Sequence, residues 1–327
     1  MVDAPLTEEL AELESRPARH RRPLLGYALV VSAVTLWAFN ATVSKVVLES
    51  GLTSFRLAET RAAGATVLFV GSVLLTRPAA LRTGRAELPW LVAFGVLGLA
   101  FVQFFYYVGI ERLDIGVALV IQYTAPVLVA LWARFAVKEP VRRRLWYALA
   151  LSLAGLSLVV ELWGGFSLDG VGVAACLVAA VSYAVYVLLA ERSLGRGRDV
   201  LSLLAWGFVV ATVFWTIAQP WWSYPFDLLD DSVSLLGRLE HVSLPVWALL
   251  LSVIVLGTFV PFILMLSALH HLRATRVVIV AMLEPVIATA IAFAWLGETL
   301  SAGQVAGGLL VLAGVGIAQT ARVHDGP

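Results

Sequence analysis

Amides and aromatic side chains recur at helical spacing inside long apolar segments of the sequence. A buried amide or phenol without a partner costs about 1–3 kcal/mol, so each of these side chains needs water, a solute or a neighbouring helix. Taken singly, each residue could bond a neighbouring helix. Because residues three or four apart share a helix face, the stripes taken together favour one water-filled cavity that binds a solute. The candidate binding residues are Trp37, Asn40, Gln103, Tyr106, Tyr107, Gln122, Tyr123, Tyr183 and Tyr186.

Two acids inside apolar segments are candidates for carrying a proton, Glu284 and Glu59. An ionised carboxylate at the centre of a bilayer costs about 2.5–3.5 kcal/mol on insertion scales, so each must be protonated, paired or in water. A carboxyl group that exchanges its proton suits proton coupling. The alternatives are a helix-packing role for Glu284 and an ion pair for Glu59, with Lys45 as the expected partner. We expect Arg56 to extend outward to water.

Pro126 and Pro285 lie inside two of the apolar segments. A proline has no N–H, so it frees the carbonyl four residues earlier, at Gln122 and at Ala281. Within a membrane a freed carbonyl must find a donor or line a cavity. The two prolines therefore predict breaks that suit a binding site or a hinge, although a plain structural kink explains them equally well.

The composition places these residues in an integral membrane protein. Of the 327 residues 60% are hydrophobic and 14% charged, with a mean hydropathy of +0.90. Soluble domains average roughly 45–50% and 25%. This excess excludes a cytosolic enzyme, and a net charge of +1 favours no nucleic-acid partner. The single cysteine, Cys176, excludes a disulfide framework, and no metal or cofactor motif is present.

We predict an all-α protein with ten transmembrane helices, because each of ten apolar segments is long enough to cross the bilayer. Residues 1–23 and 322–327 are expected to be cytoplasmic tails. The predicted spans are Leu24–Val47, Phe55–Thr76, Leu88–Ile110, Ile115–Val137, Leu145–Glu161, Gly170–Ala190, Leu201–Gln219, Leu244–Leu269, Val277–Leu296 and Gly303–Ala321.

The positions of lysine and arginine predict the orientation. With the N-terminus inside, 18 of the 23 basic residues fall in the inner segments. Inner loops of membrane proteins carry this excess of basic residues. We therefore expect a multi-pass protein of the cell membrane with both termini in the cytoplasm. The longest outer loop begins PWWSYPF, which is typical of an aromatic belt at the membrane surface.

The sequence also repeats itself at an offset of 159 residues. At this offset Gly98 aligns with Gly257, Pro126 with Pro285 and Glu139 with Glu298. A unit of five spans starts its second copy from the opposite side of the membrane. The pattern therefore predicts two inverted five-helix repeats, residues 24–162 and 167–321, which is typical of alternating-access transporters.

Three segments resemble the EamA-type branch of the drug/metabolite transporter superfamily: FRLAETRAAGA, APVLVALWARFAVKEP and EPVIATAIAFAWLGETL. The resemblance extends over residues 24–320. It implies ten helices, a central cavity lined mainly by spans 1, 3, 4, 6, 8 and 9, and export as the common direction. It also implies a structural role for Arg61, which stands where the family usually has arginine. It identifies no substrate, since members export amino acids, metabolites or drugs.

These observations together predict a secondary transporter that exports a small polar metabolite, an amino acid or a derivative, through a midplane cavity, with proton coupling left open. Efflux of drugs or toxic compounds is the main alternative, followed by a membrane scaffold and an intramembrane enzyme. We expect no enzymatic activity, because all five histidines lie in tails or at span ends. The GxxxG of Gly303 and Gly307 predicts close helix packing, either within the chain or in a homodimer.

Overall fold

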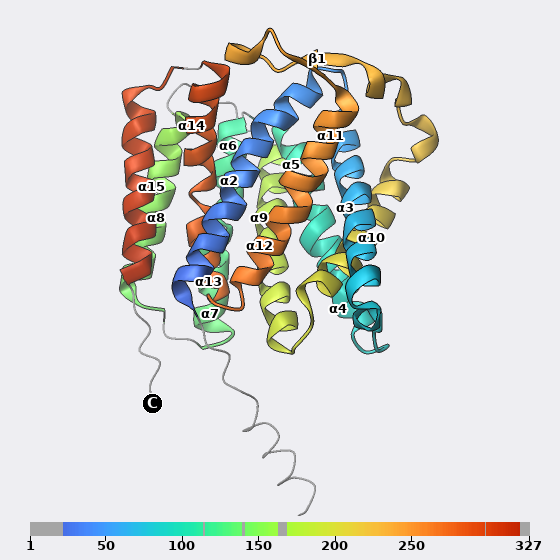
Figure 1. Cartoon of the computed structure of the whole chain (residues 1–327). Coiled ribbons are helices and arrows are strands. Elements are labelled where there is room, and N and C mark those ends of the chain that lie inside the picture. Colours follow the sequence, from blue (N-terminus) through green and yellow to red (C-terminus); the bar gives the residue numbers. More distant parts are fainter. Residues whose placement is uncertain (1–21, 114, 139–140, 163–168, 298, 321–327) are drawn as a thin grey trace, which may run out of the picture.

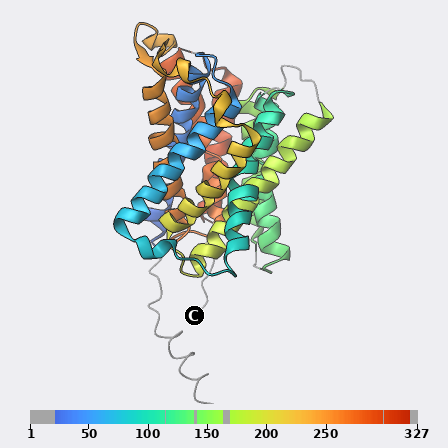
Figure 2. The same ribbon diagram turned by 90° about the vertical axis from the view of Figure 1, so that its right-hand side faces the viewer.

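The computed structural model describes residues 22–113, 115–138, 141–162, 169–297 and 299–320. The predicted tails, apart from Arg22 and Pro23, and the repeat pair Glu139 and Glu298 lie outside this part of the chain. Figures 1 and 2 show the helices side by side in one bundle, with connecting segments at its two ends.

Helices occupy all ten of the predicted segments. They are α2 (Pro23–Leu48), α3 (Ser54–Thr76), α4 (Leu88–Ala93), α5 (Phe101–Ile110), α6 (Ile115–Gln122), α7 (Ala125–Phe135), α8 (Arg143–Val159), α9 (Gly170–Gly195), α10 (Val200–Ala218), α11 (Val246–Ile254), α12 (Val260–Ala268), α13 (Ala274–Ala281), α14 (Glu284–Leu296) and α15 (Ala302–Thr320). Within the described ranges, eight helical spans are long and apolar enough to cross a membrane, some of them made of two or more consecutive helices. Ala302–Ala318 is a shorter apolar helix.

The two internal prolines divide their spans into half-helices. Tyr123 and Thr124 separate α6 from α7, and Met282 and Leu283 separate α13 from α14. Each proline stands in the first turn of the second half-helix, where its missing N–H costs least. The predicted breaks are therefore present at both positions.

Two other spans contain a π-helical segment, η2 (Phe94–Ala100) between α4 and α5 and η7 (Val255–Phe259) between α11 and α12. Each segment includes one glycine of the repeat. A Cβ on Gly98 would lie 3.1 Å from Cα of Tyr186, and a Cβ on Gly257 would overlap the side chain of Asn40. The two glycines therefore let η2 approach α9 and η7 approach α2. π-Helical turns inside α-helices are often found at functional sites.

Helices α8 and α15 pack closely at one side of the bundle (Figure 1). A Cβ on Gly155 would lie 2.6 Å from the carbonyl oxygen of Gly307, and a Cβ on Gly307 would lie 2.5 Å from that of Gly155. Gly307 of the predicted GxxxG thus serves contact within the chain. A buried apolar cluster joins this pair to α2 and α13 through Val30, Leu149, Val277 and Val311.

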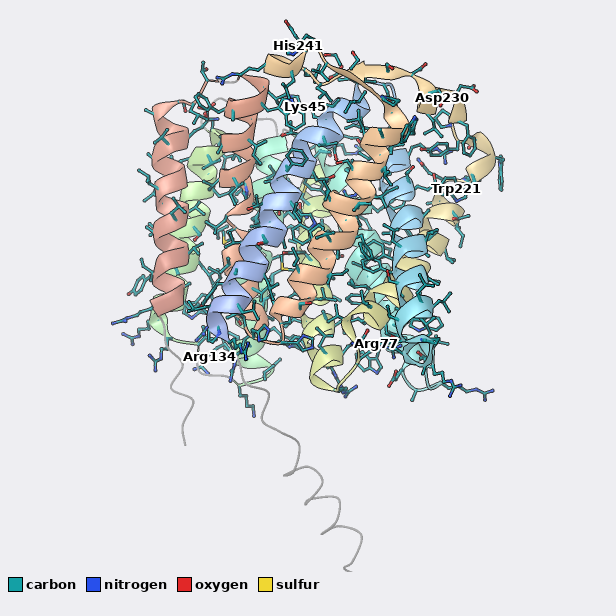
Figure 3. All side chains as sticks on the ribbon, in the orientation of Figure 1. Lys45, Arg77, Arg134, Trp221, Asp230 and His241 are labelled. Carbon is teal, nitrogen blue, oxygen red and sulfur yellow. The ribbon has the colours of Figure 1, made fainter. Side chains whose placement is uncertain are left out.

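The two ends of the bundle differ in charge and structure (Figure 3). We call the end that carries Arg77 and Arg134 the basic end, and the opposite end, with Lys45 and Asp230, the loop end. Between α10 and α11 the loop end holds the short helices η4 (Trp221–Ser223), η5 (Phe226–Asp230) and η6 (Gly237–Leu239). It also holds the antiparallel strands β1 (Ser232–Ser234) and β2 (Ser243–Pro245).

Candidate functional site

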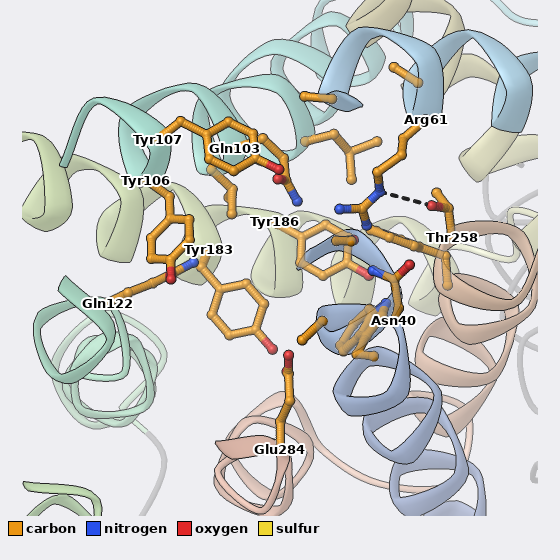
Figure 4. A pocket seen from close by; sticks show the side chains of 18 of the residues that line it. Asn40, Arg61, Gln103, Tyr106, Tyr107, Gln122, Tyr183, Tyr186, Thr258 and Glu284 are labelled. Atoms are coloured by element: carbon orange, nitrogen blue, oxygen red, sulfur yellow. Dashed lines mark hydrogen bonds between the residues drawn. The ribbon is translucent and has the colours of Figure 1, made fainter. Parts of the chain in front are cut away.

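A cavity of about 410 Å³ lies among the helices, and all nine predicted binding residues line it. They come from α2 (Trp37 and Asn40), α5 (Gln103, Tyr106 and Tyr107), α6 and its junction with α7 (Gln122 and Tyr123), and α9 (Tyr183 and Tyr186). Figure 4 shows labelled side chains of this set, among them Asn40, Gln103 and Tyr183, around one space. Small-molecule sites measure roughly 300–1,000 Å³, so this cavity suits a small solute.

Several polar atoms at the cavity have no protein partner. Among the residues that the structure describes, Oδ1 of Asn40, Oγ of Ser44 and the hydroxyl of Tyr186 are buried without a hydrogen bond. Leaving a buried polar atom unsatisfied costs about 1–3 kcal/mol. These three atoms can therefore bind a polar solute or water.

Two groups of opposite charge point into the cavity from different sides (Figure 4). Arg61 of α3 donates from Nε to Oγ1 of Thr258 at 3.1 Å and from Nη2 to the carbonyl oxygen of Gly257 at 3.4 Å. Glu284, the first residue of α14, accepts a hydrogen bond from the hydroxyl of Tyr123 at 3.0 Å. The half-helix break thus brings a carboxyl group to the wall of the cavity.

Arg61 contacts η7 through uncharged partners. None of the carboxylates in the described ranges lies within ion-pair distance of it. A cation inside a membrane protein that has no anionic protein partner is free to bind an anionic group of a solute.

Arg61 and Thr258 also line the cavity and are not among the predicted binding residues. The resemblance to other family members favoured a structural role for Arg61, yet its charge and depth in an apolar segment were a usable signal of a functional residue. Thr258 gave no such signal, because threonine is common in apolar helices. Of the two predicted hinge prolines, Pro285 lines the cavity and Pro126 is not among its lining residues.

Glu59, the second proton candidate, lies outside the lining of the cavity and is fully buried. The expected pairing with Lys45 is wrong, because Oε2 of Glu59 accepts a hydrogen bond from Nη1 of Arg56 at 2.6 Å. Arg56 also does not extend to water: it is 9% exposed and donates to the carbonyl of Pro220 and, at 2.7 Å, to Oγ of Ser223. Residues three apart on a helix share a face, which brings Arg56 to Glu59.

Long apolar helices surround an internal cavity that is large enough for a small solute. These two features define the class of the protein, a multi-span membrane protein. Residues 24–161 and again 170–319 match the EamA-like transporter family. The chain therefore belongs to this family of membrane transporters.

Individual relatives cover most of the chain. The threonine/homoserine exporter RhtA of Escherichia coli (strain K12) is 28% identical over 83% of this chain and 82% of its own. RhtA of Salmonella typhimurium (strain LT2) is 27% identical over 86% of each chain. The uncharacterized transporter YdfC of Bacillus subtilis (strain 168) is 26% identical over 76% of this chain and 78% of its own.

A solved crystal structure shares the fold. It superimposes with a TM-score of 0.72 at 16% sequence identity, over 90% of this chain and 96% of its own.

Proposed function

We propose that the protein is a secondary transporter that exports a small zwitterionic metabolite, an amino acid or a close derivative. The observation that carries this proposal is the pair of opposite charges in the cavity. Arg61 can bind a carboxylate and Glu284 an ammonium group, while the orphan oxygens of Asn40, Ser44 and Tyr186 accept or donate hydrogen bonds between them. The names of the RhtA relatives, threonine/homoserine exporters, support the same substrate class.

The proposed mechanism is alternating access between two inverted five-helix repeats that together span the membrane ten times, with both termini in the cytoplasm. Three paired features support it: the half-helix breaks before Pro126 and Pro285, the π-helical segments at Gly98 and Gly257, and two separate matches to the family. In the first two pairs the second member follows the first by 159 residues, the offset seen in the sequence. A cavity between such repeats can face one side and then the other.

Glu284 is the proposed proton-coupling group. It is the acid in the cavity lining, and it has the hydroxyl of Tyr123 as a donor. When it is protonated it loses its attraction for an ammonium group, so proton binding and substrate binding at this side chain compete, and proton uptake favours release of the substrate.

The decisive test is counterflow of amino acids in proteoliposomes that contain the purified protein. Arg61→Gln removes a charge-assisted hydrogen bond, commonly 1.5–3 kcal/mol, so the apparent affinity for the substrate should fall about tenfold to a hundredfold. The methyl ester of the same amino acid lacks the carboxylate, and its transport should change little.

Arg85→Gln is the matched control, because Arg85 is exposed and outside the cavity lining. Unchanged counterflow in Arg61→Gln, with the control also unchanged, would contradict the assignment of a carboxylate to Arg61.

Efflux of aromatic drugs is the second candidate. Trp37, Phe208, Trp215 and Phe262 also line the cavity, and such rings bind flat apolar compounds. This function predicts counterflow of a lipophilic dye that Arg61→Gln leaves intact and that Trp37→Ala lowers.

A further inference from the structure

A second pocket, of about 350 Å³, lies at the basic end, apart from the central cavity. Its walls come from the segment after α3, the start of α4, and the turn between α9 and α10. We call it the arginine pocket, because Arg82, Arg192, Arg196 and Arg198 all line it.

Positive charges outnumber negative charges in the arginine pocket. Its two lining acids are Glu87 and Asp199. Glu87 pairs with Arg198, and Asp199 pairs with Arg77 at 2.9 Å and caps the first turn of α10. Arg82, Arg192 and Arg196 form no ion pair with any residue that the structure describes.

The frame of the pocket is fixed by hydrogen bonds around Arg198. This side chain, half-buried, joins Glu87 to Thr83, to which Nη2 donates at 2.7 Å. Ser202 of α10 donates to the carbonyl of Ala80 at 2.6 Å, which holds the segment after α3 against α10. Gly197 makes the turn between α9 and α10 at a φ of +90°. The unpaired arginines therefore surround a preformed hollow rather than a loose loop.

The pocket adjoins an exposed apolar surface of α4. Leu91 lines it, and Val92, which lies deeper in the span than Trp90, is 42% exposed in a helix long enough to cross the membrane. Trp90, also in the lining, is half-exposed, and the guanidinium of Arg192 lies 4.5 Å from its ring centroid. Tryptophan is enriched at the level of lipid headgroups, so Trp90 marks this level.

We propose that the arginine pocket binds the phosphate group of an anionic phospholipid. Guanidinium groups bind phosphate through paired hydrogen bonds, and basic pockets between membrane helices accept anionic headgroups. A free phosphate ion offers the same chemistry. The exposed apolar face of α4 beside the pocket accommodates acyl chains, and this favours the lipid as the source.

The test is native mass spectrometry of the full-length protein in detergent, titrated with phosphatidylglycerol, phosphatidylcholine or inorganic phosphate. We expect bound phosphatidylglycerol in clear excess over phosphatidylcholine, and no displacement by millimolar phosphate. Each basic residue near an anionic headgroup contributes about fivefold in affinity, so R192Q/R196Q should weaken phosphatidylglycerol binding about 25-fold. Arg82→Gln should weaken it about fivefold.

The matched control is R143Q/R144Q, which removes the same charge from two exposed arginines at the start of α8 that do not line the pocket. It should leave the affinity within about twofold. Equal losses in R192Q/R196Q and in the control would overturn the proposal in favour of general surface charge. Displacement of the lipid by inorganic phosphate, or equal binding of the two lipids, would overturn the lipid as the source.

Discussion

Replacing Arg56 by methionine should destabilise the protein by about 3–5 kcal/mol, the usual cost of leaving a buried charge without its partner. The structure gives the reason. Glu59 is fully buried, and its Oε2 accepts a hydrogen bond from Arg56 at 2.6 Å. Its Oε1 has no partner among the described residues. The same substitution also removes the hydrogen bonds that Arg56 donates to the carbonyl of Pro220 and to Oγ of Ser223.

The assay is unfolding in mixed micelles by added SDS, followed through tryptophan fluorescence. In Arg56→Met/Glu59→Leu no unpaired carboxyl group is left, so this double variant should be about 2 kcal/mol or more stable than Arg56→Met alone. Arg112→Met is the matched control at the loop end. Arg112 and Asp169 are 50% and 43% exposed and 3.8 Å apart, so the change should stay within about 0.5–1 kcal/mol.

A double variant no more stable than Arg56→Met would refute the reasoning. The stability would then come from the contacts of Arg56 with Pro220 and Ser223.

Three further outcomes are expected. Glu284→Gln should fold and exchange substrate but lose accumulation driven by a pH gradient; full gradient-driven transport in this variant contradicts coupling at Glu284. Gly257→Ala should lower transport more than tenfold, because the new methyl group overlaps Asn40, and the same methyl group at the open position Gly71 should be tolerated. A cysteine at Asp230 should react with an impermeant thiol reagent in intact cells, whereas one at Arg143 should not; the reverse pattern would invert the orientation.

The sequence was sufficient to predict where the helices lie and which of their polar faces converge. Long apolar segments must be helical in lipid, and amides or phenols at helical spacing, such as Asn40, Gln103 and Tyr186, have few places to go besides a cavity. The breaks at Pro126 and Pro285 follow from the missing N–H alone.

Other features depended on tertiary contacts that no local pattern encodes. The π-helical turns at Gly98 and Gly257 add one residue to a helical turn, and in an apolar background this leaves no mark except a glycine. The pairing of Glu59, by contrast, could have been predicted from the local sequence, because Arg56 is three residues away on the same helix face. The place of Arg61 in the cavity lining was not predicted, because its uncharged partners on η7 lie nearly 200 residues away in the chain.

The segment between α10 and α11 connects helices that are remote in sequence. Thr60 of α3 bonds the hydroxyl of Tyr224 at 2.8 Å, and Trp295 of α14 donates to the carbonyl of Leu235 at 2.9 Å. Between these two hydrogen bonds the chain includes the short helix η5. Fully extended, residues 224–235 would span about 36 Å. The length of this segment therefore allows α3 and α14 to separate at the loop end while both hydrogen bonds are kept. The resistance to that movement is the unwinding of η5 together with the loss of apolar contacts around Tyr224 and Leu235, which are buried in one cluster with Val43 and Val246.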